Sequence, residues 1–384
     1  MKISFICGSL APGKDGVGDY VRRLSEKMVE LGWKCFCISL NDTEEVIDMP
    51  LTNNAGLPRV NYCRIKESSD IGYKKELLST ALTLFKPDIC SLQLVVYSFH
   101  PRGWMREFNV SFAPILAKYK THLMWHELWI GQLSNSTLKE KIEGFWQKKQ
   151  IFQLLQIIRP RLQHTSVAFY QALLRKQKID VKLLPLFSNF SLDRAENFDL
   201  KEKLNLIPSE PVPLLLVSFG TIYKHFPFEQ WLKDAIDWSK HTGRSIILCS
   251  IGKTGTSSEI WREWEKYTIA HGIDKIKLHS LGVLSPSEIQ SIFASAEAGL
   301  SLTPFEAWGK SGAIAAMHES GLPIIIYEFG ISTFDFVPES TNGLINFKIN
   351  TLNKWPLKFE RHIAQNKLPQ ICEKFIADLE TIIS

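Results

Sequence analysis

The sequence alternates between short apolar runs and amphipathic helical patterns, and it does so in two successive stretches. In the first stretch, an apolar run at residues 2–7 is followed by a helical pattern at 19–31 and a second apolar run at 34–40. This order predicts a βαβ unit, which requires a parallel sheet with a right-handed crossover. The alternation restarts at residue 214 and continues to an apolar run at 324–327. We therefore expect an α/β protein with two parallel-sheet domains.

The domain boundaries follow from length and composition. A chain of 384 residues fits two domains, and residues 191–213 are polar, charged and proline-containing. We expect a first domain at 1–190, a linker at 191–213, a second domain at 214–366 and a closing helix at 367–384. Further strands are expected at 86–93, 122–126, 163–168, 181–185, 214–219, 245–251, 276–281 and 299–302. Further helices are expected at 77–85, 139–158, 226–241, 257–271, 285–296 and 313–319.

The composition argues against several classes of protein. Lys and Arg number 45 against 40 Asp and Glu, and a net charge of +5 does not indicate a nucleic-acid partner. No apolar stretch is long enough to span a bilayer, and the first apolar run is a strand and not a signal peptide. The seven cysteines are an odd number, and Cys35 and Cys37 lack a common zinc spacing. We expect reduced core thiols in a cytoplasmic protein.

The first candidate site is "GKDGVGDY", between the first strand and the first helix. Gly16 and Gly18 permit positive φ and a close approach of a ligand to the backbone. Val21 stands where the third glycine of a dinucleotide fingerprint would lie, and a Walker loop is not present. The segment is either a loop against which a sugar or acceptor lies, or a plain βα turn.

Two further segments end predicted strands. In "MWHELWIG", His126 stands at a carboxyl end, where parallel sheets bind ligands, and it can donate a hydrogen bond to a ligand. The alternative is a partly buried histidine satisfied by backbone. In "SFGTIYKHF", a strand ends at Gly220, and Thr221 and Lys224 follow. A cation there suits a diphosphate, although a lone lysine in a loop is often only solvated.

The most specific segment is "TPFEAWGKSGAIAAMHESGLPIII", which predicts a loop, a helix, a turn and a strand. The first amides of a helix lack partners and carry partial positive charge, so they form a natural anion site. Lys310 and the amides of Ser311 and Gly312 are expected to hold phosphate oxygens, and Glu306 to accept hydrogen bonds from ribose or sugar hydroxyls. The alternative is a simple pair between Glu306 and Lys310 at i,i+4 spacing.

Together these segments resemble the GT-B glycosyltransferases, in particular the retaining family 4 type. The resemblance rests on "DGVGDYVRRLSEKMVELGW", "HELW", "SFGTIY" and "LGVLSPSEIQSIFASAEAGLSLTPFEAWGKSGAIAAMHESGLPIII". It implies two Rossmann-like domains facing each other across a cleft, with the acceptor mostly in the first and the nucleotide sugar mostly in the second. It also implies that the closing helix returns to the first domain. Glu306 matches the first glutamate of the family's Glu-x7-Glu pattern, and Ile314 stands in place of the second.

The resemblance implies a metal-independent transferase that moves a sugar from a nucleotide diphosphate sugar to a hydroxyl acceptor with retention of configuration. His126 and Glu306 are the expected catalytic residues. The nucleotide sugar is a co-substrate, and no resident cofactor is expected. Three alternatives remain: a nucleotide-sugar epimerase or phosphorylase on the same fold, a nicotinamide dehydrogenase, and a non-catalytic paralogue that binds a partner transferase.

The acceptor is expected to be a glycan or a lipid-linked molecule, as in polysaccharide or glycoconjugate biosynthesis. Residues 139–163 mix Phe, Trp and Ile with several Lys and Arg, a pattern typical of an interfacial helix. This pattern is consistent with peripheral contact at the inner face of a membrane. The alternative is a core-packed helix with a solvated basic face.

Overall fold

The computed structural model describes residues 1–13, 15–49, 59–132, 136–190, 211–223, 225–252, 257–329, 343–351 and 353–383. Most of the expected linker and Lys224 lie outside the described residues. The described chain forms two compact units. Unit 1 contains the residues up to Asn189 together with those from Leu368 onward, and unit 2 contains the described residues between Phe190 and Lys367.

Unit 1 is built on an eight-stranded sheet with the order β3-β4-β2-β1-β5-β6-β7-β8. Its pairs are parallel except that of β3 with β4. The chain order reverses at β1, which has β2 on one side and β5 on the other, and such switch points favour ligand binding. The strands are β1 Lys2–Cys7, β2 Lys34–Asp42, β3 Val46–Ile47, β4 Asn61–Lys66, β5 Ile89–Leu94, β6 Lys120–Trp125, β7 Leu162–Thr165 and β8 Lys182–Leu183.

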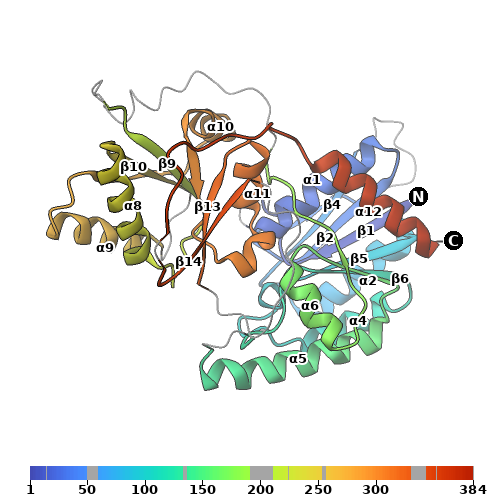
Figure 1. Cartoon of the computed structure of the whole chain (residues 1–384). Coiled ribbons are helices and arrows are strands. Elements are labelled where there is room, and N and C mark those ends of the chain that lie inside the picture. The colour runs from blue at the N-terminus through green and yellow to red at the C-terminus, as the bar shows by residue number, and fades with distance from the viewer. Residues whose placement is uncertain are drawn as a thin grey trace. The chain divides into compact units, whose positions relative to one another are not determined.

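Helices cover both faces of this sheet, and two buried clusters fill the layers between them. One cluster includes residues of α2, α4 and α5, and the other includes residues of α1 and α12. Figure 1 shows α12 beside α1 in unit 1, and the two helices are in contact. The expected return of the closing helix to the first domain is therefore confirmed. The helices are α1 Gly16–Glu30, α2 Ile71–Phe85, η1 Val96–Ser98, α3 Arg106–Ser111, α4 Ala113–Leu116, α5 Leu138–Ile158, α6 Ala168–Lys176 and α12 Leu368–Ile383.

Unit 2 is built on a six-stranded parallel sheet with the order β11-β10-β9-β12-β13-β14. Its core is rich in aromatic rings, and Phe228 stacks on Trp264 with 4.4 Å between the ring centroids. The strands are β9 Leu214–Phe219, β10 Ile246–Ile251, β11 Ile276–Gly282, β12 Ala298–Leu300, β13 Ile324–Glu328 and β14 Leu344–Lys348. The helices are α8 Phe228–Thr242, α9 Ser257–Ala270, α10 Pro286–Ser295, η2 Phe305–Lys310 and α11 Gly312–Glu319.

The predicted α/β class with two parallel sheets is confirmed. The helix expected at 285–296 is α10, which begins with a capping box: the Ser285 hydroxyl accepts from the Glu288 amide at 3.3 Å, and Glu288 accepts from the Ser285 amide at 2.8 Å. Strands β3, β4 and β14 were not predicted from the sequence. The residues of β4 and β14 are only partly buried and carry a weak apolar signal. The short helices α3, α4 and α6 were not predicted either.

All seven cysteines are buried and free of disulfides. Burial raises the pKa of the thiols, for example that of Cys63 to about 12, so these side chains act as neutral apolar groups. Six of them lie in unit 1 and only Cys249 lies in unit 2. Pulsed alkylation of these thiols can therefore follow the unfolding of each unit separately.

Docking of α12 is expected to contribute strongly to the stability of unit 1. Phe375 is buried, and its ring lies 6.3 Å from Phe5 and 5.0 Å from His122. We expect Phe375→Ala to lower the unfolding free energy of unit 1 by about 3–5 kcal/mol, because it leaves a cavity between helix and sheet. Alkylation of the unit 1 thiols across a urea series measures this loss. The exposed Glu373→Ala is the control, and equal unfolding midpoints for the two variants would contradict the account.

Candidate functional site

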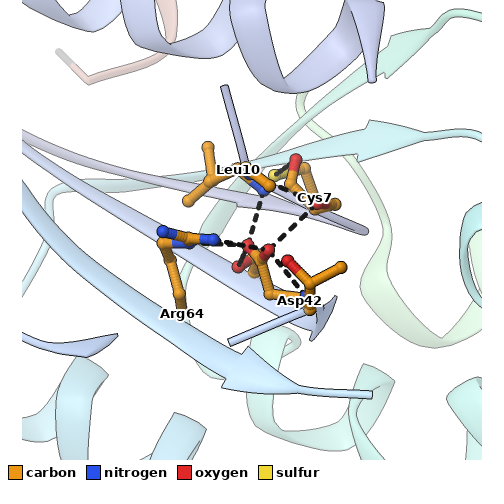
Figure 2. Close-up of polar contacts among 8 residues, drawn as sticks. Cys7, Leu10, Asp42 and Arg64 are labelled. Atoms are coloured by element: carbon orange, nitrogen blue, oxygen red, sulfur yellow. Dashed lines mark hydrogen bonds and ion pairs between the residues drawn. The ribbon is translucent and has the colours of Figure 1, made fainter. Parts of the chain in front are cut away.

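A buried carboxylate organises the carboxyl ends of β1, β2 and β4 (Figure 2). Asp42 Oδ2 accepts from the Leu10 amide at 2.8 Å and from the Ser39 hydroxyl at 2.7 Å. Asp42 Oδ1 accepts from the Ser9 hydroxyl at 3.2 Å and from the Thr43 amide at 2.9 Å. The guanidinium of Arg64 donates to both oxygens, at 2.9 and 3.0 Å. Each carboxylate oxygen therefore accepts three hydrogen bonds.

This arrangement fixes the loop that follows β1 and occupies Asp42 completely. The hydrogen bonds from Arg64 and from the Leu10 amide outweigh burial and hold the pKa of Asp42 well below its usual range, so it is ionised. An acidic residue after the second strand binds ribose in dinucleotide folds. Here both oxygens are engaged within the protein, which does not favour the dehydrogenase alternative. Asp42 binds the loop backbone at Leu10 and thereby anchors the start of the β1–α1 connection at the carboxyl edge of the sheet.

The two candidate glycines of this segment lie in the first turn of α1, which begins at Gly16 and is capped by Asp15. Both have helical backbone, so neither uses the positive φ that glycine permits. A Cβ at Gly18 would lie 2.4 Å from the Ser9 carbonyl oxygen, so this glycine is required by the close approach of the chain's own loop. A Cβ at Gly16 would meet only Asn189, at an ordinary 3.5 Å.

His126 directly follows β6 and is almost fully buried. Its Nε2 lies 2.8 Å from Gln93 Oε1, and Tyr20 meets the ring edge-on with centroids 5.2 Å apart. Burial lowers the pKa of His126 to about 3, so the imidazole is neutral. Since an amide oxygen only accepts, Nε2 carries the proton and donates it to Gln93. The expected donation to a ligand therefore does not fit this ring, whose remaining nitrogen, Nδ1, is an acceptor.

Sequence reasoning did not find the side chains that support His126. Gln93 and Ser91 lie on β5, and His122 lies on β6. The four-residue spacing of His122 and His126 places both on one face of a strand, and this was the available signal. Their partners on β5 depend on strand register, which the sequence does not specify.

In unit 2, glycines with positive φ stand at the carboxyl ends of three neighbouring strands. Gly220 follows β9 with φ +89°, Gly252 follows β10 with φ +121°, and Gly282 ends β11 with φ +71°. A Cβ on Gly252 would lie 3.5 Å from the Cα of Gly220, so backbone lies against backbone here. A Cβ on Gly220 would lie 3.3 Å from that of Ala313 in the first turn of α11. Only Gly220 was among the predicted residues.

The segment before α11 forms the 3₁₀ helix η2, which contains both Glu306 and Lys310. Glu306 is buried, and Lys310 ends η2 with partial exposure. Ser311 is the N-cap of α11: its hydroxyl accepts from the Ile314 amide at 3.2 Å, and its own amide donates to the Trp308 carbonyl at 3.0 Å. The Ser311 amide is therefore not available to a phosphate, contrary to expectation.

The remaining first-turn amides of α11 belong to Gly312 and Ala313, and neither has an acceptor among the described residues. Such amides at a helix N-terminus are suited to an anion. Ile314 is buried in the core where the family pattern has its second glutamate. Thr221 is exposed after β9, and the predicted Lys224 lies outside the described residues.

The predicted residues therefore fall into two groups. Gly16, Gly18 and His126 belong to unit 1, and Gly220, Thr221, Glu306, Lys310, Ser311 and Gly312 belong to unit 2. The structure brings Gly220 beside the N-terminus of α11. Within the described residues, no three His, Cys, Asp or Glu side chains form a group that could hold a metal ion. None of the described helices is both long and apolar enough to cross a membrane.

Comparison with known proteins identifies the fold. No sequence-family profile and no curated protein sequence matches the chain. Solved structures do match over nearly its whole length. The E. coli trehalose-6-phosphate structure with bound UDP-2-fluoro glucose has a TM-score of 0.59 at 12% identity, covering 100% of this chain and 99% of that one.

Two further solved structures match the chain over nearly its whole length. A glycosyltransferase from Rickettsia africae has a TM-score of 0.57 at 12% identity, covering 99% of this chain and 88% of that one. The Anabaena protein HepE, in complex with UDP and glucose, has a TM-score of 0.55 at 12% identity, covering 100% and 92%. These likenesses show a fold with two parallel-sheet domains that matches GT-B glycosyltransferases.

The buried histidines predict a loss of stability in mild acid. Burial lowers the pKa of His126 to about 3 and of His164 to about 4, and that of His122 falls well below its usual value. As the pH falls through about 6.5, the unfolded chain binds protons that folded unit 1 cannot bind. This stabilisation is complete above that pH, and each histidine loses about 1.4 kcal/mol per pH unit below it.

Alkylation of the unit 1 thiols in urea at about pH 7.5 and 5.5 measures the effect. We expect unit 1 to lose about 4 kcal/mol, and His126→Gln to remove about one third of this dependence, because glutamine can still donate to Gln93. Unit 1 stability that is constant or rising on acidification would contradict the assignment of neutral histidines.

Proposed function

We propose that the protein is a glycosyltransferase that transfers a sugar from a nucleotide diphosphate sugar to a hydroxyl acceptor. The observation that carries the proposal is the carboxyl edge of the unit 2 sheet. There the backbone at Gly220 lies against the first turn of α11, where Gly312 and Ala313 present amides without a described acceptor. A diphosphate fits this chemistry, because the amides supply hydrogen bonds and the helix supplies partial positive charge.

The side chains around these amides suit the rest of a donor. Lys310, two residues before α11, supplies a positive charge for the diphosphate. Lys224, which follows Gly220 in the sequence, is proposed as a second cation for the same group. Glu306 accepts hydrogen bonds from ribose or sugar hydroxyls. Because two of the similar structures contain UDP or a UDP sugar, we propose a uridine diphosphate sugar as the first donor to test.

The proposed reaction proceeds with retention and without a metal ion. The bond between the sugar C1 and the diphosphate oxygen breaks, and its electron pair goes to the diphosphate. The acceptor oxygen bonds to C1 on the same face, and its proton passes to the departing phosphate oxygen. The helix N-terminus and the lysines stabilise the charge that develops on the diphosphate. His126, at the carboxyl edge of the unit 1 sheet, is proposed as a hydrogen-bonding partner for a sugar hydroxyl.

We further propose that α5 binds an anionic membrane surface. Its C-terminal half contributes Ile151, Leu154 and Ile158 to the core. Its N-terminal half exposes large apolar side chains on the opposite face: Leu138 is 75% exposed, Ile142 53%, Phe145 63% and Trp146 49%. An apolar stripe of this kind on a helix that is already anchored to the core suits insertion at a lipid interface.

The charges on α5 are arranged in agreement with this role. With 3.6 residues per turn, Lys139, Lys141 and Lys149 flank the exposed apolar stripe, whereas Glu140 and Glu143 lie toward the core-facing side. Lys149 also lies over the Trp146 ring, 5.3 Å from its centroid. Basic residues around an apolar stripe are attracted to anionic lipids, which places a lipid-linked acceptor within reach.

Removing the Lys310 charge tests the donor site. We expect Lys310→Ala to weaken UDP binding by about 10- to 100-fold, the usual effect of losing a charge-assisted hydrogen bond. Isothermal titration calorimetry of wild type and variant measures it, and added chelator is expected to leave binding unchanged. Lys275→Ala is the matched control, because Lys275 is exposed at the opposite, amino end of β11. Equal affinities for wild type and Lys310→Ala would refute the phosphate assignment.

Flotation with lipid vesicles tests the membrane surface. We expect the full chain to float with phosphatidylglycerol vesicles but weakly with pure phosphatidylcholine. The double variant Phe145→Ser, Trp146→Ser should bind at least about tenfold more weakly, because both aromatic side chains leave the lipid interface. Ile269→Ser removes an equally exposed apolar residue from α9 in unit 2 and should have no effect. Equal flotation of the two variants would show that α5 is not the contact.

A further inference from the structure

A continuous row of buried polar side chains crosses the unit 1 sheet from His126 to α12. It contains Ser91 and Gln93 on β5, His122 on β6 and His164 on β7, and it ends at Asp378 on α12. The side chains of β5, β6 and β7 in this row are almost fully buried. Polar groups in such a layer are costly unless each is hydrogen-bonded, so a row of them calls for an explanation.

Five hydrogen bonds join these six residues end to end. His126 Nε2 lies 2.8 Å from Gln93 Oε1, and Gln93 Nε2 lies 2.7 Å from Ser91 Oγ. Ser91 Oγ lies 2.8 Å from His122 Nδ1. His122 Nε2 then lies 3.0 Å from His164 Nδ1, and His164 Nε2 lies 3.0 Å from Asp378 Oδ2. We call this row the histidine relay.

Asp378, the carboxylate at the end of the histidine relay, sets the direction of every hydrogen bond in it. Lys182 at 2.6 Å and Lys374 at 3.2 Å also donate to Asp378, and these lysines and His164 outweigh burial and hold its pKa at about 2. An ionised carboxylate only accepts, so His164 donates from Nε2. With a neutral ring, His164 then accepts at Nδ1 from His122.

The directions of the remaining bonds follow one by one, from His122 to His126. His122 donates from Nε2 and therefore accepts at Nδ1 from the Ser91 hydroxyl. The one hydrogen of that hydroxyl is used in the bond to His122, so the Ser91 oxygen accepts from the Gln93 amide nitrogen. The Gln93 amide oxygen therefore faces His126. His126 consequently carries its proton on Nε2. All three rings are neutral, because burial lowers the pKa of each.

We propose that Asp378 is a positioning residue that, through the histidine relay, fixes His126 in the Nε2–H form with Nδ1 as its acceptor. The C-terminal helix thus sets the hydrogen-bonding character of a ring at the ligand-binding edge of the sheet. Asp378 and His126 are far apart in sequence and share no direct contact. Docking of α12 supplies the charge that the histidine relay needs.

The consequence for catalysis rests on the proposed function. A neutral ring with an unprotonated Nδ1 accepts a hydrogen bond from a sugar hydroxyl. The opposite tautomer would present a donor in the same place. The histidine relay therefore selects a hydroxyl donor on the ligand at this position.

Nitrogen-15 NMR of the full chain labelled at histidine tests the proposal. We expect His126, His122 and His164 to show a protonated Nε2 and an unprotonated Nδ1 at neutral pH, with each ring assigned from its own His→Gln variant. A protonated Nδ1 on His126, or two protonated nitrogens on His164, would overturn the proposal.

Two variants and a control test the role of Asp378. In Asp378→Asn the two lysines donate to the amide oxygen, so the amide nitrogen becomes a donor to His164. Every hydrogen bond in the histidine relay should then reverse its direction, and His126 should carry its proton on Nδ1. Gln93→Leu should release His126 into a mixture of tautomers while His122 and His164 keep theirs. Lys182→Met retains the carboxylate and should change no tautomer. Unchanged His126 tautomers in both Asp378→Asn and Gln93→Leu would refute the coupling.

A kinetic measurement separates this proposal from the proposed function. If the transferase activity exists, Asp378→Asn should lower kcat while leaving KM for the donor nearly unchanged, since unit 2 is intact. If no transfer is found but the tautomers behave as expected, the proposed function fails and the histidine relay stands. If transfer is found but the tautomers differ, only the histidine relay fails.

Discussion

In a parallel sheet every strand ends at the same edge, and the functional account of this protein depends on that constraint. In unit 1 it gathers Asp42, the loop after β1 and His126 at the ends of β2, β1 and β6. In unit 2 it places Gly220 against Gly252 and against the first turn of α11. The apolar interiors of the strands make the sheets stable, and the residues just past the strand ends are left to carry chemistry.

The sequence predicts this plan well, because its strongest signals are local. Apolar periodicity located most strands and the long helices, and it also located α10. It also placed Gly220 and His126 at strand ends. Strands β4 and β14 were not predicted because they are only partly buried. The 3₁₀ helix η2 was not predicted because its sequence lacks a distinctive apolar periodicity. Gly16 and Gly18 were predicted to lie in the loop before the helix, but helix α1 starts earlier than its apolar pattern indicated.

Contacts between residues that are far apart in the sequence could not be predicted, because they depend on how the elements pack. Arg64 reaches Asp42 only because β4 pairs with β2, and His164 reaches Asp378 only because α12 packs on unit 1. These contacts also correct the roles assigned to single residues. Ser311 caps α11 with its hydroxyl and donates its amide internally, and His126 donates to Gln93. The type of a residue indicates which hydrogen bonds it can form. The hydrogen bonds that it forms within the protein decide which of its donors and acceptors are left for a ligand.

The central claim is that the N-terminus of α11 holds the diphosphate of an activated sugar. Backbone NMR tests it most directly, through the amide resonances of Gly312 and Ala313 during titration with UDP and, in parallel, with uridine. The account predicts that both amides shift strongly downfield with UDP and stay in place with uridine, since charged oxygens are their expected acceptors. If UDP binds and shifts other amides while these two remain unmoved, the claim is contradicted.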